Sequence, residues 1–210
     1  KDQRVTINGE VTTKKDIHVD IESDVIMVDG QVVNTKQQYY VKFHKPKGYV
    51  TAVVDAKHPV VMDLLPPEYI KMGVVPVGRL DKDTEGLLLL TNDGVWGHSI
   101  INGNKHVSKV YYVEYDGELT EEGIQRIKEG IVLGDGTYCK PALIDVLSSQ
   151  SLHITIEEGK YHQVKRMIGA AGGTVTYLKR LTIGHIDLTG IEEVGSIQGL
   201  TIGDIEAFKK

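Results

Sequence analysis

The sequence predicts an α+β fold in which a largely antiparallel, mixed β-sheet domain follows a small β-rich unit. Three observations support this prediction. Short β-type runs dominate the chain, helical patterns are few, and turn signals of the hairpin type separate the first runs. A doubly wound parallel sheet requires strands and helices to alternate regularly, and these do not.

The first 36 residues make up the small β-rich unit. Residues 4–7 and 25–28 are β-type runs, and Asn8-Gly9 and Asp29-Gly30, which follow them, are strong hairpin signals. Residues 34–38 contain no apolar side chain and are the best linker candidate. We therefore predict two domains, residues 1–36 and 37–210. The chain opens without Met in the middle of an element, so we expect the small unit to be the tail of something larger.

The second domain is predicted to be mainly strands. The expected strands are residues 39–43, 49–54, 74–77, 87–91, 109–115, 140–146, 152–157 and 174–183. Thr120, followed by two glutamates, is expected to cap a helix that runs to about Gly130, and Thr201 to begin a short terminal helix.

A third helix is predicted over residues 161–171. The apolar residues with helical spacing are Tyr161, Val164, Ile168 and Ala171. Gly172-Gly173 ends the pattern. This phase places His162, Lys165 and Arg166 together on the opposite face of the helix.

Composition excludes several classes of protein. Of the 210 residues, 40% are hydrophobic and 25% charged, as in a soluble globular protein. The apolar runs are far shorter than the roughly 20 residues that cross a bilayer, and the N-terminus has no apolar signal core, so we expect no membrane association. A single cysteine, Cys139, excludes an internal disulfide or a thiolate cluster and predicts an intracellular, cytoplasmic protein.

Charge is distributed unevenly along the chain, whose formal net charge is −5. Residues 114–135 carry a net charge of −5, whereas residues 36–48 hold four lysines and no acid, and residues 157–181 carry a net charge of +3. Such runs are usually solvated surface, but the two basic segments allow contact with nucleic acid.

Residues 78–86 contain the densest group of charged side chains that could take part in catalysis. This polar loop, bounded by Gly78 and Gly86, leads into four consecutive leucines, residues 87–90. A loop that enters a buried strand can hold a carboxylate rigidly, which makes Asp81 a catalytic candidate. Asp83 and Glu85 are interpreted as surface charges, and a solvated turn is the simpler alternative for the whole loop.

The sequence motifs do not predict a metal site or a nucleotide-binding site. The acidic loop matches only the first half of a calcium-binding loop, because Asn92 stands where a bidentate Glu is needed. The glycine patterns that bind dinucleotides and nucleoside triphosphates are absent, and His98 and His106, or His153 and His162, are too far apart for a metal pair. We expect no cofactor and no metal.

Four blocks in order resemble the motifs of the RNA pseudouridine synthases, in the RsuA family that modifies ribosomal RNA. They are Lys45-Pro46-Lys47-Gly48-Tyr49, the loop Gly78-Arg79-Leu80-Asp81 with Thr84 and residues 86–94, the tyrosine strand Lys109-Val110-Tyr111-Tyr112-Val113, and Glu158-Gly159-Lys160-Tyr161-His162-Gln163-Val164-Lys165-Arg166-Met167. Residues 93–98 and Lys140-Pro141-Ala142 resemble most the small-subunit, 16S enzyme.

The resemblance implies a pseudouridine synthase fold for residues 37–210 and a partial S4 RNA-binding domain, with its helices absent, for residues 1–36. It implies a cofactor-free isomerase that converts a uridine of 16S ribosomal RNA to pseudouridine, with uridine-516 as the target. The expected partner is 16S ribosomal RNA within an assembling small subunit, and the protein is expected to be a monomer without a nucleotide cofactor.

The resemblance also suggests roles for individual residues. Asp81 is the nucleophile, attacking the sugar or the base or promoting a glycal route. Lys165 pairs with this aspartate and keeps it ionised. Tyr111 stacks against the base, and its hydroxyl helps to move the C5 proton. Arg79 fills the gap left by the flipped uridine.

Phosphate contacts are expected from basic residues of the same motifs. The residues expected to contact RNA are Lys42, Lys45, Lys47, Lys109, Lys160, His162, Arg166, Lys179 and Arg180, in addition to Arg79. Arg166 in particular is expected to point toward phosphate.

Three alternative functions stay open at the level of sequence. One is a pseudouridine synthase for 23S ribosomal RNA, and another is a non-catalytic ribosome-assembly factor that binds ribosomal RNA and has no need of Asp81. A glycoside hydrolase would use Asp81 with Asp83 or Glu85, but a sugar cleft is usually lined with aromatic residues, and the chain has one Trp and two Phe.

Overall fold

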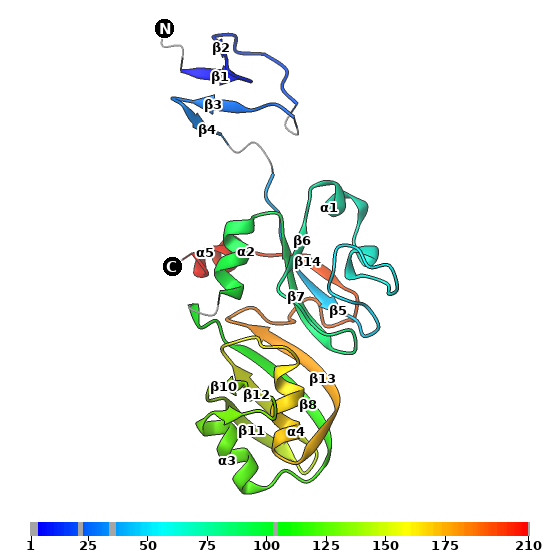
Figure 1. Cartoon of the computed structure of the whole chain (residues 1–210). Coiled ribbons are helices and arrows are strands. Elements are labelled where there is room, and N and C mark those ends of the chain that lie inside the picture. Colours follow the sequence, from blue (N-terminus) through cyan, green and yellow to red (C-terminus); the bar gives the residue numbers. More distant parts are fainter. Residues whose placement is uncertain (1–3, 21–22, 34–36, 103–104, 210) are drawn as a thin grey trace. The chain divides into compact units, whose positions relative to one another are not determined.

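The chain forms two compact units, Lys1–Gln38 and Tyr39–Lys210, each described here by itself (Figure 1). The computed structural model describes residues 4–20, 23–33, 37–102 and 105–209. Residues 34–36 of the predicted linker lie outside the described residues. No helix in the described part of the chain is long and apolar enough to cross a membrane.

The first unit is an antiparallel sheet of four short strands. Their order across the sheet is β2 (Glu10–Thr12), β1 (Val5–Ile7), β3 (Ile26–Val28) and β4 (Gln31–Val32). Two-residue turns close both hairpins, and all four turn residues have positive φ: 50° at Asn8, 86° at Gly9, 53° at Asp29 and 77° at Gly30. Positive φ at both central positions favours Asn-Gly and Asp-Gly, so the predicted hairpins are confirmed.

The second unit is built on an eight-stranded mixed sheet. Along the sheet the order is β11 (Leu143–Ser148), β12 (Ser151–Ile156), β8 (Lys109–Gly117), β13 (Gly173–Ile183), β7 (Glu85–Thr91), β5 (Tyr40–Lys45) and β14 (Ile197–Gly199), with β6 (Val75–Val77) paired to β7 beside this path. Adjacent strands are antiparallel except β13 and β7, which are parallel. The predicted α+β class with a largely antiparallel sheet is confirmed.

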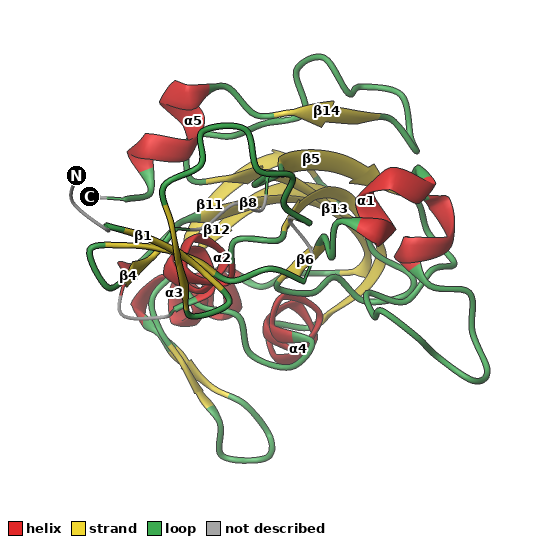
Figure 2. Cartoon of the chain, turned by 90° about the horizontal axis from the view of Figure 1, so that it is seen from above, coloured by secondary structure: helices red, strands yellow, loops and turns green. Residues whose placement is uncertain are grey.

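Short helices and one small hairpin complete the second unit. They are η1 (Val61–Leu64), α1 (Pro67–Lys71), α2 (Gly94–Ile101), α3 (Glu121–Glu129), β9 (Ile131–Val132), β10 (Tyr138–Cys139), α4 (Gln163–Ala170) and α5 (Ile202–Ala207). Figure 2 shows α3 and α4 on one side of the curved sheet. The Thr120 hydroxyl caps α3 by accepting from the Gly123 amide, and Thr201 caps α5 in the same way, as predicted.

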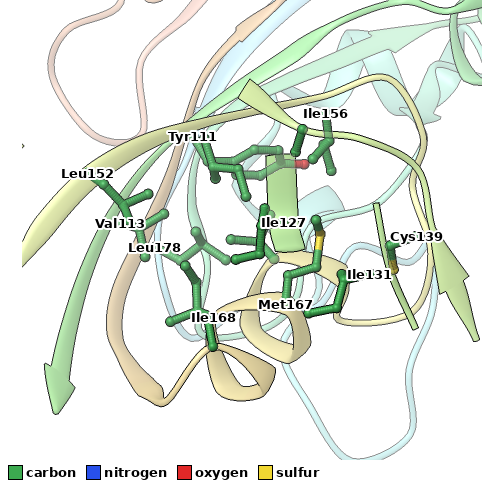
Figure 3. Close-up of a cluster of buried hydrophobic side chains, with 14 of the residues drawn as sticks. Tyr111, Val113, Ile127, Ile131, Cys139, Leu152, Ile156, Met167, Ile168 and Leu178 are labelled. Atoms are coloured by element: carbon green, nitrogen blue, oxygen red, sulfur yellow. The ribbon is translucent and has the colours of Figure 1, made fainter. Parts of the chain in front are cut away.

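The core explains why β7 is a run of leucines. Leu87 and Leu89 pack in one hydrophobic cluster, with Trp96 of α2, and Leu88 and Leu90 pack in another cluster on the opposite face of the sheet. A strand that is buried on both faces has no polar positions. A third cluster joins β8 and β12 to α3 and α4, and Figure 3 shows the Tyr111 ring at one edge of it, on the same side as Ile156.

The structure differs from the predicted secondary structure in several places. Residues 49–54 form no strand, only an isolated bridge from Val50 to Val60, and the Thr51 hydroxyl bonds to the backbone of Leu80. Helix α2 was not predicted, although the Asp93 side chain caps it by accepting from the Trp96 amide. The third helix begins at Gln163, and Tyr161, predicted to be apolar core, is 76% exposed.

Candidate active site

A cleft of about 650 Å³ opens where the sheet splits beside β7. The first residues of β7 pair with β13, whereas its last residues pair with β6, and the cleft lies between β6 and β13. Its walls are the loop of residues 78–84, the end of α2, the start of β8, the residues leading into α4, and β13. Asp81, Tyr111 and Lys165, the three predicted catalytic residues, all line this cleft.

Two cationic or basic side chains flank the carboxylate of Asp81. Lys165 Nζ lies 3.2 Å from Asp81 Oδ2, and His162 Nε2 lies 3.3 Å from Asp81 Oδ1. The Asp81 side chain keeps 30% of its exposure. The carboxylate is therefore sheltered and paired, yet open to a molecule that enters the cleft.

Lys165 also contacts a second carboxylate of the loop. Its Nζ donates to Asp83 Oδ1 at 2.6 Å. Burial lowers the pKa of Lys165, but hydrogen bonds and charge from Asp83 and Asp81 outweigh this and raise the pKa overall. Burial raises the pKa of Asp83, and the Lys165 ammonium more than offsets this, so that pKa is lowered. Asp83, predicted as a plain surface charge, is thus part of an ion-pair cluster.

Two buried side chains, Lys45 and Thr51, form hydrogen bonds with the backbone of the Asp81 loop. Lys45 Nζ donates to the carbonyls of Asp81 at 3.1 Å and of Thr84 at 2.8 Å. The Thr51 hydroxyl donates to the Leu80 carbonyl at 2.8 Å and accepts from the Leu80 amide at 3.1 Å. These contacts fix the direction in which Asp81 projects.

The prediction that Lys45 contacts phosphate was wrong. Lys45 is fully buried, and its third hydrogen bond goes to the Pro46 carbonyl at 3.0 Å. Burial lowers the pKa of Lys45 to about 8, even though the charges of Asp83 and Asp81 raise it. Lys45 is a cation that supports the loop from inside the protein, out of reach of RNA.

Arg180, predicted to contact phosphate, is almost fully buried at the border of the cleft. It is 3% exposed, its Nε donates to the Leu87 carbonyl at 2.7 Å, and it borders the cleft under Tyr111. A guanidinium nitrogen of Arg180 lies 3.4 Å from the Tyr111 hydroxyl. The hydroxyl of Tyr111, whose side chain is 8% exposed, therefore lies beside a buried cation.

The other predicted RNA-binding residues divide into two groups. Lys109, Lys160 and His162 line the cleft with Arg79. Burial and the charge of Arg180 lower the pKa of Lys109. Lys160 is 3.3 Å from Glu158 and donates to the Tyr138 carbonyl.

The remaining predicted residues lie outside the cleft lining. Lys47 Nζ lies 4.1 Å from the centre of the Tyr177 ring, and Lys179 lies 3.6 Å from Glu85. Lys42 donates to the Asp187 and Thr189 carbonyls. Arg166 was expected to point toward phosphate, but it forms an ion pair with Asp135 at 2.5 Å because helix phase turns it away from Lys165.

The cleft combines a held carboxylate with an apolar, aromatic wall. Such a site can deliver a nucleophile to a planar group that enters from solvent. Among the described residues, His, Cys, Asp and Glu form no group of three or more that could hold a metal ion.

Comparison with known proteins identifies the chemistry. Residues 39–170 match the family model described as RNA pseudouridylate synthase. The chain belongs to this family. The matched region contains the Asp81 loop, β8 with Tyr111, and Lys165, so the three predicted catalytic residues of this pseudouridine synthase all lie within the family match.

Relatives of the pseudouridine synthase share most of its length. The ribosomal small subunit pseudouridine synthase A of Yersinia pestis is 37% identical over 97% of this chain and 86% of its own length. YtzG, an RNA pseudouridine synthase of Bacillus subtilis, is 38% identical over 94% of this chain and 84% of its own. A crystal structure of a pseudouridylate synthase, 34% identical, superposes with a TM-score of 0.75 over 98% of this chain and 89% of its own.

Proposed function

We propose that this RNA pseudouridine synthase modifies 16S ribosomal RNA and that Asp81 is its nucleophile. The observation that carries the proposal is the position of the Asp81 carboxylate, in the cleft between Lys165 and His162 on a loop whose backbone is anchored by Lys45 and Thr51. Support for the 16S substrate comes from relatives named ribosomal small subunit pseudouridine synthase A, which are 34–37% identical to this chain. We place the target at uridine-516.

The reaction breaks the C1′–N1 bond of uridine and forms a C1′–C5 bond to the same base. C5 loses its proton and N1 gains one, so the product is an isomer of uridine. Asp81 attacks the sugar or the base, or promotes a glycal route, and is regenerated when the new bond forms. The Lys165 ammonium, 3.2 Å away, offsets the cost of holding this negative charge in a partly desolvated site. No electron is gained or lost in these steps, so the proposed reaction needs no oxidant or reductant.

Tyr111 provides the surface for the detached base. Its ring lies in the cleft wall, and the Arg180 guanidinium orients its hydroxyl. Stacking would hold the uracil while it turns from N1 to C5, and the hydroxyl would accept or relay the C5 proton. Arg79, exposed on the loop next to Leu80, would occupy the space that the flipped uridine leaves.

The first unit is proposed to be part of an S4 RNA-binding domain. The support is its small antiparallel sheet with two tight hairpins. In this proposal the protein acts as a monomer in the cytoplasm, where the small ribosomal subunit is assembled, and phosphate contacts from Lys47 and Lys160 add affinity with little sequence preference.

Tritium release tests the function and the substrate together. Transcripts of 16S and 23S ribosomal RNA labelled with tritium at uridine C5, and small-subunit assembly particles, are incubated with the protein. Release from 16S transcripts or from the particles, with the modified position mapped by carbodiimide-dependent reverse-transcription stops, is the expected result. Release from 23S transcripts alone would overturn the 16S assignment, and a stop at another position would overturn uridine-516.

A further inference from the structure

Tyr161 is an exposed aromatic residue on the rim of the cleft. Although it lines the cleft, its side chain is 76% exposed, whereas Tyr111 in the cleft wall is 8% exposed. Among the described residues Tyr138 is the other tyrosine classed as exposed, and it lies outside the cleft lining. An exposed aromatic ring beside an active site offers a flat surface on which a nucleobase can stack.

The Tyr161 ring stacks on His162, and His162 in turn contacts Asp81. The Tyr161 and His162 ring centres are 3.9 Å apart, with an angle of 16° between the planes. His162 Nε2 lies 3.3 Å from Asp81 Oδ1. One face of the tyrosine ring is thus occupied by the imidazole, and its other face is open to solvent.

The backbone at His162 is arranged to create this stack. His162 has φ 46° and ψ 38°, the left-handed conformation that a side chain with a Cβ seldom adopts. Two neighbouring hydrogen bonds hold the backbone in this conformation. The Gln163 amide donates to the Lys160 carbonyl, and the Arg166 side chain donates to the Tyr161 carbonyl. Helix α4 therefore begins only at Gln163, and Tyr161 is turned out of the core to the cleft rim.

We propose that the open face of Tyr161 stacks on the nucleobase next to the target uridine. This inference rests on the proposed function, because it requires an RNA whose uridine reaches Asp81. When a uridine is flipped out, its neighbouring base loses a stacking partner, and an aromatic side chain can replace it. His162 links Asp81 to Tyr161, because its Nε2 lies 3.3 Å from Asp81 and its ring centre lies 3.9 Å from the Tyr161 ring centre. The Tyr161 ring is therefore within reach of the nucleotide next to a uridine bound at Asp81.

The proposal is tested first by affinity and turnover. Tyr161→Leu should weaken RNA binding by about 5- to 100-fold, and raise KM with kcat changed by less than about threefold, because stacking on a base is lost. Tyr161→Phe should behave like the parent. Tyr138→Leu is the matched control, since it removes an exposed tyrosine outside the cleft, and it should change neither value. Unchanged affinity for Tyr161→Leu, or a fall in kcat with KM unchanged, would overturn the proposal and assign Tyr161 to positioning His162.

A second test identifies the stacked base. In ribosomal RNA fragments around the uridine that mapping identifies, 2-aminopurine is placed in turn on either side, and its fluorescence should be quenched by the parent protein and not by Tyr161→Leu. An abasic nucleotide at that same position should weaken binding to the parent as much as Tyr161→Leu does. Tyr161→Leu should bind the abasic RNA no more weakly than the parent binds it. Losses that multiply would show that Tyr161 and that base do not meet. Because the target is mapped in 16S and 23S transcripts alike, a failure of the 16S assignment would leave this test intact.

Discussion

The Lys165 ammonium lies 2.6 Å from Asp83, closer than the 3.2 Å that separates it from Asp81. The lysine is therefore shared by two carboxylates of the same loop. Asp83 is 72% exposed, so its attraction for Lys165 is screened by water, whereas Asp81 faces the cleft. The cluster keeps Lys165 charged and in place, while a substrate approaches Asp81.

Replacement of the two aspartates should separate chemistry from positioning. Asp81→Asn is expected to reduce tritium release by about 10³-fold or more, because an amide is not a nucleophile, while RNA affinity stays within about twofold. Asp83→Asn should keep activity within about tenfold, since Lys165 can still pair with Asp81. Release by Asp81→Asn at even a tenth of the parent rate would show that Asp81 is not the nucleophile.

Lys165 should matter for its charge. Lys165→Met is expected to lower single-turnover rate by about 10²-fold, because the Asp81 carboxylate loses its ion-pair partner in the cleft. Lys165→Arg should lose about tenfold, since the charge survives with altered geometry. Lys128→Met is the control, because this lysine is exposed on α3 outside the cleft lining, and it should stay within about threefold of the parent. Equal losses for Lys165→Met and Lys128→Met would mean that the charge on Lys165 has no particular role.

Lys45 should affect the loop and not the binding of phosphate. Lys45→Met leaves the carbonyls of Asp81 and Thr84 without their buried donor, so we expect a lower Tm and a kcat reduced by about tenfold or more. The slope of log affinity against log salt should not change. The exposed Lys47 is the matched control: Lys47→Met should lower that slope by about 0.7 to 0.9 and leave Tm unchanged. A shallower slope for Lys45→Met would restore Lys45 to the RNA-binding surface.

The lowered pKa of Lys45 predicts how stability depends on pH. Burial places the pKa near 8 in the folded protein against 10.5 in the unfolded chain, so between these values the unfolded chain binds more protons. The free energy of unfolding of the parent, measured relative to Lys45→Met by urea titration, should therefore rise from pH 8 to pH 10.5, by roughly 2–3 kcal/mol. A difference that is constant or falls over this window would contradict the burial of the charge.

Gly86 should tolerate no side chain. It has φ +113°, and a Cβ there would lie 2.2 Å from the Arg180 carbonyl oxygen and 2.6 Å from its amide nitrogen. Gly86→Ala must force β7 away from β13, so we expect the free energy of unfolding to fall by about 3 kcal/mol or more, or the protein to fail to fold. Gly94, where nothing lies within 4 Å of an added Cβ, is the control, and Gly94→Ala should be neutral or slightly stabilising.

Local patterns in the sequence were sufficient for much of the fold. The two hairpins of the first unit follow from Asn8-Gly9 and Asp29-Gly30, because these turns require backbone angles that such residues favour. The four leucines of β7 indicate a strand that is buried on both faces. Thr120 and Thr201 mark the starts of two helices, because a hydroxyl satisfies amides that the helix cannot. In each case the physical cause lies within a few residues of its effect.

The tertiary structure decided which charged residues meet. By itself the sequence determined an α+β sheet protein with a candidate carboxylate at Asp81, and its motifs suggested Lys165 as the partner. It could not show that Lys45 is buried while Lys47 is exposed, because the three carbonyl acceptors of Lys45 include two that lie more than 30 residues away. Nor could it place Tyr161 on the rim of the cleft, since helical periodicity predicted a core residue and the left-handed turn at His162 reversed its direction. Burial and ion pairing depend on contacts between segments far apart in the chain, and only the folded arrangement of β5, β7, α4 and β13 brings those segments together.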